Sequence, residues 1–258
     1  MKIKLASLAG VTLLASGFLA QNEATPKLVC QGEYSALGRD SKGDPKTTKV
    51  DRWHMDSMQD GSYSVDVELE RPKIEEHRFF TKEFKPKSFV SVLSGGGLGK
   101  PMTIECDYGA TDLGCHTTFG GSSAAATIAQ KPPYAFVPTF EALTFDFPWA
   151  FQAIVSQAER TIGQKTAIPL IALEDGETKN SISLKVQGVE QVEYRGREAI
   201  ETLGQKILAY KFRLVDPKDP EHARDLWMSD SGILLSMTID DSGARINLTE
   251  YQGPSLSP

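Results

Sequence analysis

Hydrophobic and polar residues alternate with a period of two through the last part of the chain. One alternating run covers 233–240, with Ile233, Leu235, Met237 and Ile239 on one side. A second covers 244–251, with Ala244, Ile246 and Leu248 on one side. Neighbouring side chains of a strand point to opposite faces, and Asp-Ser-Gly at 230–232 and 241–243 has the composition of tight turns. The pattern predicts an antiparallel meander at this end of the chain.

Similar short alternating runs, separated by turn-rich loops, fill most of the remaining sequence. They cover 28–34, 50–58, 62–70, 77–84, 87–93, 102–108, 113–119, 167–173, 181–194, 197–202 and 205–215. No helical pattern lies between successive strands, which excludes a parallel α/β sheet. We therefore predict a mainly β fold, a large curved antiparallel sheet or half-open barrel of about ten to twelve strands.

One segment, 147–162, has helical spacing. Asp146 is a suitable N-cap, Pro148 falls in the first turn and Gly163 is a suitable stop. One face of this helix carries Phe151, Ile154, Val155, Ala158 and Ile162. We expect it to be the principal helix of the protein and to pack on the concave side of the sheet.

The region 120–140 is rich in Gly, Ala, Ser and Pro and is predicted to be a flexible crossing segment. Aromatic residues follow closely, at Phe136, Phe140, Phe145, Phe147, Trp149 and Phe151. These six side chains either fill the barrel as core or form a lid over an apolar pocket, which is the usual composition of a small-ligand site. They are the ligand-binding residues that the sequence predicts.

The first twenty residues resemble a secretory signal peptide. Met1 to Lys4 is a short basic start, and 5–20 is apolar, uncharged and somewhat short for a membrane span. An uncleaved anchor is the alternative, but glycines weaken it and no stop-transfer charges follow. We expect cleavage between about residues 17 and 24, a single β-rich domain over 25–258, a periplasmic or secreted location, and no stable membrane span after cleavage.

The charge of the sequence and its cysteines limit which binding partners and which cellular compartment are expected. The formal net charge is −6 without a basic cluster, which argues against binding nucleic acid. Among the three cysteines, Cys106 and Cys115 lie on runs that fold back on each other around 110–111, so a cross-strand disulfide is predicted. A disulfide from Cys30 to one of them is the competing arrangement. A zinc site of Cys106, Cys115 and His116 matches no usual ligand spacing.

Nothing in the sequence indicates catalysis, a metal or a cofactor. The four histidines, at 54, 77, 116 and 222, contain no pair at metal-ligand spacing and are interpreted as strand-surface residues. No nucleophile elbow or comparable catalytic motif is present. The sequence therefore predicts a protein that is not an enzyme.

The segment 203–251 resembles a known class of proteins. Ala209-Tyr210-Lys211-Phe212 leads to a loop, then Trp227 is followed by the first Asp-Ser-Gly turn and an apolar strand, and Leu248-Thr249-Glu250-Tyr251 closes the run. This is similar to uncharacterised exported β-rich proteins whose sheet resembles that of the LolA/LolB lipoprotein carriers. The resemblance implies a half-open antiparallel barrel whose concave face binds lipid chains, with no specific binding residue carried over.

Two functions follow from these expectations. The first is a non-enzymatic exported protein that binds a hydrophobic small molecule or lipid in the concave face of the sheet. The alternative is an interaction scaffold for another envelope protein, with a filled barrel and no small-molecule ligand.

Overall fold

The computed structural model of the chain describes residues 27–39, 42–70, 73–94, 100–129, 135–137, 154–155, 158–175, 182–240 and 243–256. Strands make up most of these residues. The first eight are β1 (Lys27–Arg39), β2 (Pro45–Ser57), β3 (Tyr63–Glu70), β4 (Lys73–Phe80), β5 (Pro86–Ser94), β6 (Met102–Tyr108), β7 (Asp112–Phe119) and β8 (Ser122–Ala129). The others are β9 (Ala135–Val137), β10 (Lys165–Asp175), β11 (Ile182–Thr202), β12 (Gln205–Asp216), β13 (Asp219–Met228), β14 (Leu234–Ile239) and β15 (Arg245–Gln252).

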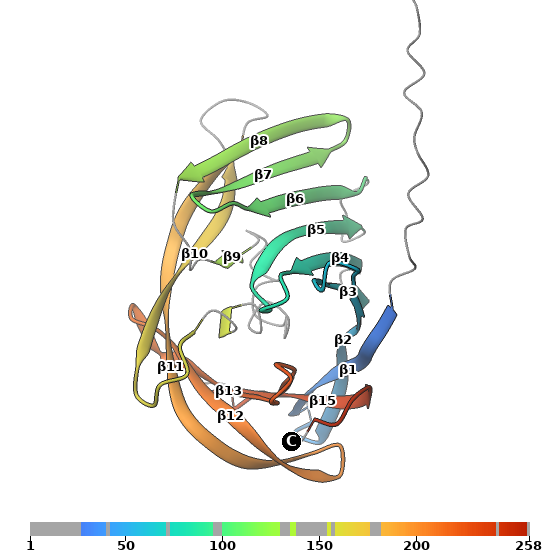
Figure 1. Cartoon of the computed structure of the whole chain (residues 1–258), viewed down its shortest axis with the longest axis vertical. Coiled ribbons are helices and arrows are strands. Elements are labelled where there is room, and N and C mark those ends of the chain that lie inside the picture. The colour runs from blue at the N-terminus through green and yellow to red at the C-terminus, as the bar shows by residue number, and fades with distance from the viewer. Residues whose placement is uncertain are drawn as a thin grey trace, which may run out of the picture.

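All fifteen strands belong to one sheet, and its order shows two arms joined in the middle. The order is β8-β7-β6-β5-β4-β3-β2-β1-β15-β14-β13-β12-β11-β10-β9. Each arm is a series of neighbours in sequence, whereas the junction pairs the first strand with the last. Figure 1 shows the sheet curling round so that β8 approaches the wall made by β10 and β11. The sheet order places no hydrogen-bonded ladder between β8 and that wall, so the barrel is not closed.

The predicted antiparallel, curved, mainly β architecture agrees with this sheet, but the predicted fold class was wrong in two respects. The sheet has fifteen strands instead of ten to twelve, and the short β9 joins β10 in parallel. Part of the difference in strand number arises at 120–140, because this region was predicted to be a flexible crossing segment and contains β8 and β9. The second error is the principal helix.

The described part of 147–162 contains helical conformation only at Ile154 and Val155. Beyond them the chain turns toward β10: the Glu159 N–H donates to the Thr166 hydroxyl, and the Gly163 N–H donates to the Tyr194 carbonyl. These hydrogen bonds to β10 and β11 replace the i→i−4 bonds of a helix. Ile162, placed on the predicted apolar face, is 73% exposed. Helical periodicity thus described the two buried residues Ile154 and Val155 correctly and the described backbone of 158–162 incorrectly. No helix among the described residues has the length and apolar character needed to cross a membrane.

The predicted C-terminal meander is confirmed. β13, β14 and β15 pair antiparallel, and the two Asp-Ser-Gly tripeptides fall in the two connections. At the first turn the Ser229 N–H donates to the Ile233 carbonyl, and Gly232 has φ +82°, a conformation that favours glycine. Both faces of β14 are buried, since Leu234, Leu235 and Ser236 are fully covered.

The main core follows the concave side of both arms. Its largest fully buried side chains include Trp53, Tyr34, Phe80 and Phe212. A smaller core lies between β5, β6 and β7 and is built from Phe89, Ile104, Leu113 and the cysteine pair. The predicted disulfide is confirmed: Cys106 and Cys115 are direct cross-strand partners with a Cα–Cα distance of 4.2 Å. The third cysteine, Cys30, is free and buried.

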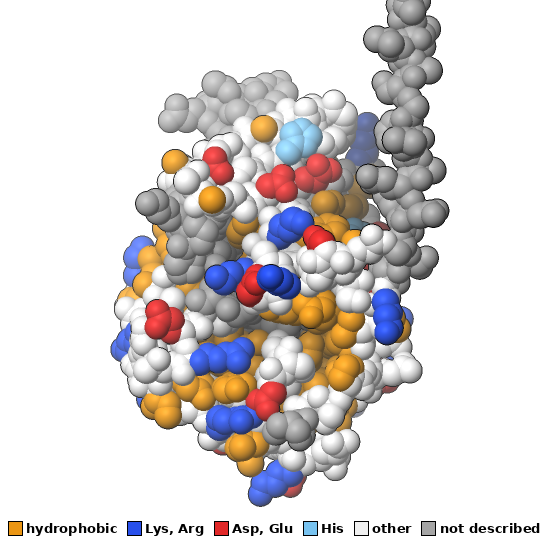
Figure 2. All heavy atoms as spheres, in the orientation of Figure 1, with side chains coloured by type: hydrophobic (Ala, Val, Ile, Leu, Met, Phe, Trp, Pro, Cys, Tyr) orange, Lys and Arg blue, Asp and Glu red, His pale blue; other side chains and the backbone are white. Residues whose placement is uncertain are grey.

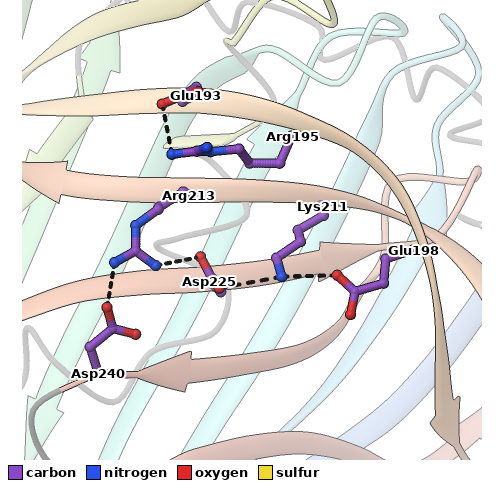
Figure 3. A network of polar contacts seen from close by, with 7 residues as sticks. All are labelled: Glu193, Arg195, Glu198, Lys211, Arg213, Asp225 and Asp240. Carbon is purple, nitrogen blue, oxygen red and sulfur yellow. Dashed lines mark hydrogen bonds and ion pairs between the residues drawn. The ribbon is translucent and has the colours of Figure 1, made fainter. Parts of the chain in front are cut away.

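Polar side chains on β11 to β14 form a network across the strands (Figure 3). The Asp225 carboxylate lies between Lys211 and Arg213, at 3.5 and 3.0 Å. Lys211 also pairs with Glu198 at 2.8 Å, and Arg213 with Asp240. Because Asp225 and Glu198 each face an opposite charge on the adjacent strand β12, the network favours this strand register over a slipped one.

Replacing both disulfide cysteines, Cys106→Ser with Cys115→Ser, should lower the free energy of unfolding by about 2–3 kcal/mol, because the bond restricts the unfolded chain. Urea unfolding of the oxidised protein and the double variant measures this. A double variant as stable as the parent would show that the bond contributes nothing to folding.

Replacing the shared carboxylate, Asp225→Asn, should destabilise the protein by about 0.5–1 kcal/mol, since Lys211 and Arg213 would lose their common partner. High salt should shrink this difference. Urea unfolding at low and high sodium chloride gives the comparison. The matched control is Glu105→Gln, because the Glu105 side chain is on the exposed face of β6. A loss that is equal at both salt concentrations would argue that packing, and not charge, explains it.

Candidate functional site

A cavity of about 330 Å³ lies at one end of the sheet, where β1 and β3 begin and β2, β13 and β15 end. The turn between β4 and β5 and the first Asp-Ser-Gly turn complete its wall. This volume is at the lower end of the range of small-molecule pockets. The strands bring together side chains from both arms of the sheet, so the cavity depends on the junction between them.

The inner wall of this end cavity is apolar. Cys30, Met55, Met228 and Ile233 line it and are each at most 3% exposed, and two aromatic rings, Tyr63 and Phe84, complete it. Polar side chains lie at the rim: Lys82, Glu83, Arg160 and Asp230. An apolar interior with a few charges at the entrance is the common composition of a binding site for an organic ligand. Figure 2 shows apolar, basic and acidic side chains intermixed on one face of the molecule.

Two arginines at this end contact one aromatic ring. The guanidinium carbons of Arg160 and Arg197 each lie 4.6 Å from the centre of the Tyr210 ring. Arg197 also forms an ion pair with Asp230 at the cavity rim. Cation–π contacts of this kind fix a flexible cationic side chain against a surface.

Cys30 belongs to the wall as a packing residue. Burial raises the pKa of its thiol to about 11, an effect that the hydrogen bond with Tyr251 only partly offsets. A thiol with so high a pKa is almost entirely protonated at neutral pH and is a poor nucleophile. Its position therefore supplies apolar surface and no reactive group.

Buried charges lie elsewhere on the concave side. Glu76 and Arg78 on β4 form an ion pair at 2.7 Å, and Arg78 also lies over the Phe89 ring. Across the sheet, Glu190 on β11 pairs with Arg224 on β13 at 3.4 Å. All four side chains are over 90% buried. A buried charge is costly unless it is paired, and each of these charges has an opposite charge within ion-pair distance.

Asp51 on β2 is a buried acid of a different kind. It is 3% exposed, and neither carboxyl oxygen has a hydrogen bond of normal geometry, although the Tyr34 backbone lies close enough to favour the charged form slightly. Burial raises its pKa well above the usual range, and the negative charges of Glu76 and Glu33 raise it further. The carboxyl group is therefore stabilised in its neutral form.

On the convex side, the structure brings together two histidines that the sequence showed only as scattered. The Asp66 carboxylate on β3 contacts His54 of β2, at 2.9 Å, and His77 of β4. All three side chains are at least 30% exposed. Within the described ranges, no group of three or more His, Cys, Asp or Glu side chains is arranged to hold a metal ion.

The aromatic residues predicted to bind ligand are not part of the described cavity. Phe140, Phe145, Phe147, Trp149 and Phe151 lie outside the described residues, and of Phe136 only the backbone, in β9, is described. Their role stays a prediction. Sequence reasoning missed the end cavity, since its wall comes from seven separated segments of the chain. Only the first Asp-Ser-Gly turn was a local signal for one of them.

Comparison with known proteins supports the fold. No family model matches the chain, and no curated protein sequence matches it. A solved structure does: a β-barrel-like protein of the domain of unknown function DUF1849 from Brucella abortus, at 12% identity and a TM-score of 0.51, covering 90% of this chain and all of that one. The chain is thus similar to a β-rich, barrel-like class of unknown function. The expected likeness to the lipoprotein carriers stays a prediction, and the disulfide is compatible with an exported protein.

Replacing the buried acid, Asp51→Asn, should stabilise the protein at pH 7 by about 1–3 kcal/mol, because the native state disfavours its ionised form. The raised pKa means that the folded state holds the proton more tightly than the unfolded state, whose pKa is about 3.9. The penalty therefore grows as pH rises above that value and disappears at lower pH.

Urea unfolding of Asp51→Asn and the parent at pH 4 and pH 7 measures this difference. The exposed substitution Asp107→Asn is the control and should show no such change with pH. A variant less stable than the parent at pH 7 would mean that the Asp51 carboxylate has a stabilising partner.

Proposed function

We propose that this protein is a non-enzymatic exported protein that binds a small hydrophobic molecule or lipid in the end cavity. The observation that carries the proposal is the cavity itself, which has a buried apolar wall and about 330 Å³ of space. Burying an apolar ligand there would remove the ligand's surface from water, at about 25 cal/mol per Å². The resemblance of 203–251 to proteins with a carrier-like sheet is in keeping with a lipid as the ligand.

The composition of the wall favours a ligand without a unique shape. Met55 and Met228 are flexible, polarisable side chains that adapt to irregular apolar surfaces. Tyr63 and Phe84 stand next to each other, with ring centres 5.6 Å apart, and supply broad flat contacts. Such a wall suits alkyl chains or related apolar groups better than a polar metabolite.

The proposal is tested on protein purified from its own cell envelope. Native mass spectrometry and extraction into organic solvent should recover a hydrophobic molecule, and calorimetric titration of the stripped protein with fatty acids should give heat of binding. Empty protein, together with fatty acids that give no heat, would overturn the proposal. Recovery of a cross-linked envelope protein with an empty cavity would favour the scaffold function instead.

A cavity-filling variant locates the site. Val29→Trp places a bulky ring in the cavity and should weaken binding of the recovered ligand by about tenfold or more while the fold is kept. Val186→Trp, an exposed position on β11, is the matched control and should bind like the parent. Equal weakening by both variants would indicate a general effect on folding and would place the ligand elsewhere.

A further inference from the structure

The rim of the end cavity carries two acids and two bases, and three of these charges are already neutralised. Asp230 pairs with Arg197, which stands outside the cavity. Lys82 and Glu83 are neighbours with 3.8 Å between the ammonium nitrogen and a carboxylate oxygen. Arg160 has no ion pair among the described residues. Among the described residues, Arg160 is therefore the one charge at the entrance without an ion-pair partner.

The position of Arg160 is fixed by its surroundings. Its guanidinium lies over the Tyr210 ring, at 4.6 Å from the ring centre. The backbone on both sides is held to the sheet, through the hydrogen bonds of Glu159 to Thr166 and of Gly163 to Tyr194. A guanidinium held in this way has lost much of its rotational freedom before a ligand arrives, which lowers the entropic cost of binding.

A guanidinium recognises one ligand chemistry especially well. Its planar set of N–H donors matches the two oxygens of a carboxylate or of a phosphate, and such charged hydrogen bonds are stronger than neutral ones. The apolar wall, formed by Met55, Met228 and Ile233, lies behind it. The site thus places an anion-binding group at the entrance of an apolar cavity.

From these contacts we infer that the end cavity binds an amphiphile with one anionic head group, with the head on Arg160 and the apolar chain against the buried wall. This inference rests on the proposed function and specifies its ligand class. It excludes neutral lipids and cationic amphiphiles as preferred ligands. A long-chain carboxylate and a phosphate-bearing lipid share this chemistry.

The test compares decanoate with decanamide, which has the same chain and a neutral head group. In calorimetric titrations at pH 7 and low salt, decanoate should bind the parent protein about tenfold more tightly than decanamide. Arg160→Gln should remove this preference by weakening only decanoate, while Arg160→Lys, which keeps the charge, should retain part of it. Lys85→Gln, which removes an exposed positive charge in the β4–β5 turn beside Lys82 to Phe84 but outside the cavity lining, is the control and should behave like the parent.

The outcomes separate the two proposals. Equal affinities for decanoate and decanamide would overturn the anionic head group and leave hydrophobic binding intact. A preference for decanoate that persists in Arg160→Gln would overturn the role of Arg160. No binding of either compound to the parent would contradict the proposed function together with this inference. Decyl phosphate, run in parallel, distinguishes the head groups: tighter binding than decanoate would favour a phosphate-bearing lipid.

Discussion

The ladder between β1 and β15 is the interaction on which the rest of the sheet depends. It joins an arm made of β2 to β8 to an arm made of β9 to β14, and no other ladder in the described sheet connects them. Side chains reinforce the junction: the Tyr34 hydroxyl donates to the Leu234 carbonyl at 2.7 Å, and the Thr249 hydroxyl donates to the Glu33 carbonyl. Gly32 permits the close approach, because a Cβ atom there would lie 2.7 Å from the Glu250 carbonyl oxygen and 2.8 Å from the Trp53 ring. Any larger residue would push the two arms apart.

The same junction creates the candidate site. β1 supplies Val29 and Cys30, β15 and the residues after it supply Tyr251 and Pro254, and the other walls come from turns of the two arms. The cavity lies where the arms meet at one end, and not along the middle of the concave face. Further along that face, buried ion pairs such as Glu76 with Arg78 occupy space that a hydrophobic ligand would otherwise use. Apolar lining and buried charge are thus kept in separate parts of the interior.

Local signals explain what could be predicted from the sequence. Alternation at 233–240, the Asp-Ser-Gly turns and the facing cysteines each involve residues close in the chain, and the structure has the meander and the disulfide they predicted. The helix predicted over 147–162 failed at its described end, because Thr166 and Tyr194 hold the residues after Val155 by hydrogen bonds that a continuing helix would not make. The junction had no local signal, and the cavity had one only in the first Asp-Ser-Gly turn of its wall. Arg160, which is not among the residues of the predicted apolar helix face, gained its position only from the fold.

The ladder in the middle of the described sheet, which pairs the first strand with the last, has a kinetic consequence. Every other antiparallel ladder joins strands that follow each other along the chain, so each arm can grow by hairpin formation, which takes microseconds. Pairing Gln31 with Gln252 closes a loop of more than two hundred residues, but the entropic cost of closure rises only with the logarithm of loop length. If the arms form first, the closing encounter is between two preformed sheets whose unpaired β1 and β15 edges are exposed until they meet. During that interval the same edges are open to strands of other molecules, so the protein is most prone to aggregate just before its fold is complete.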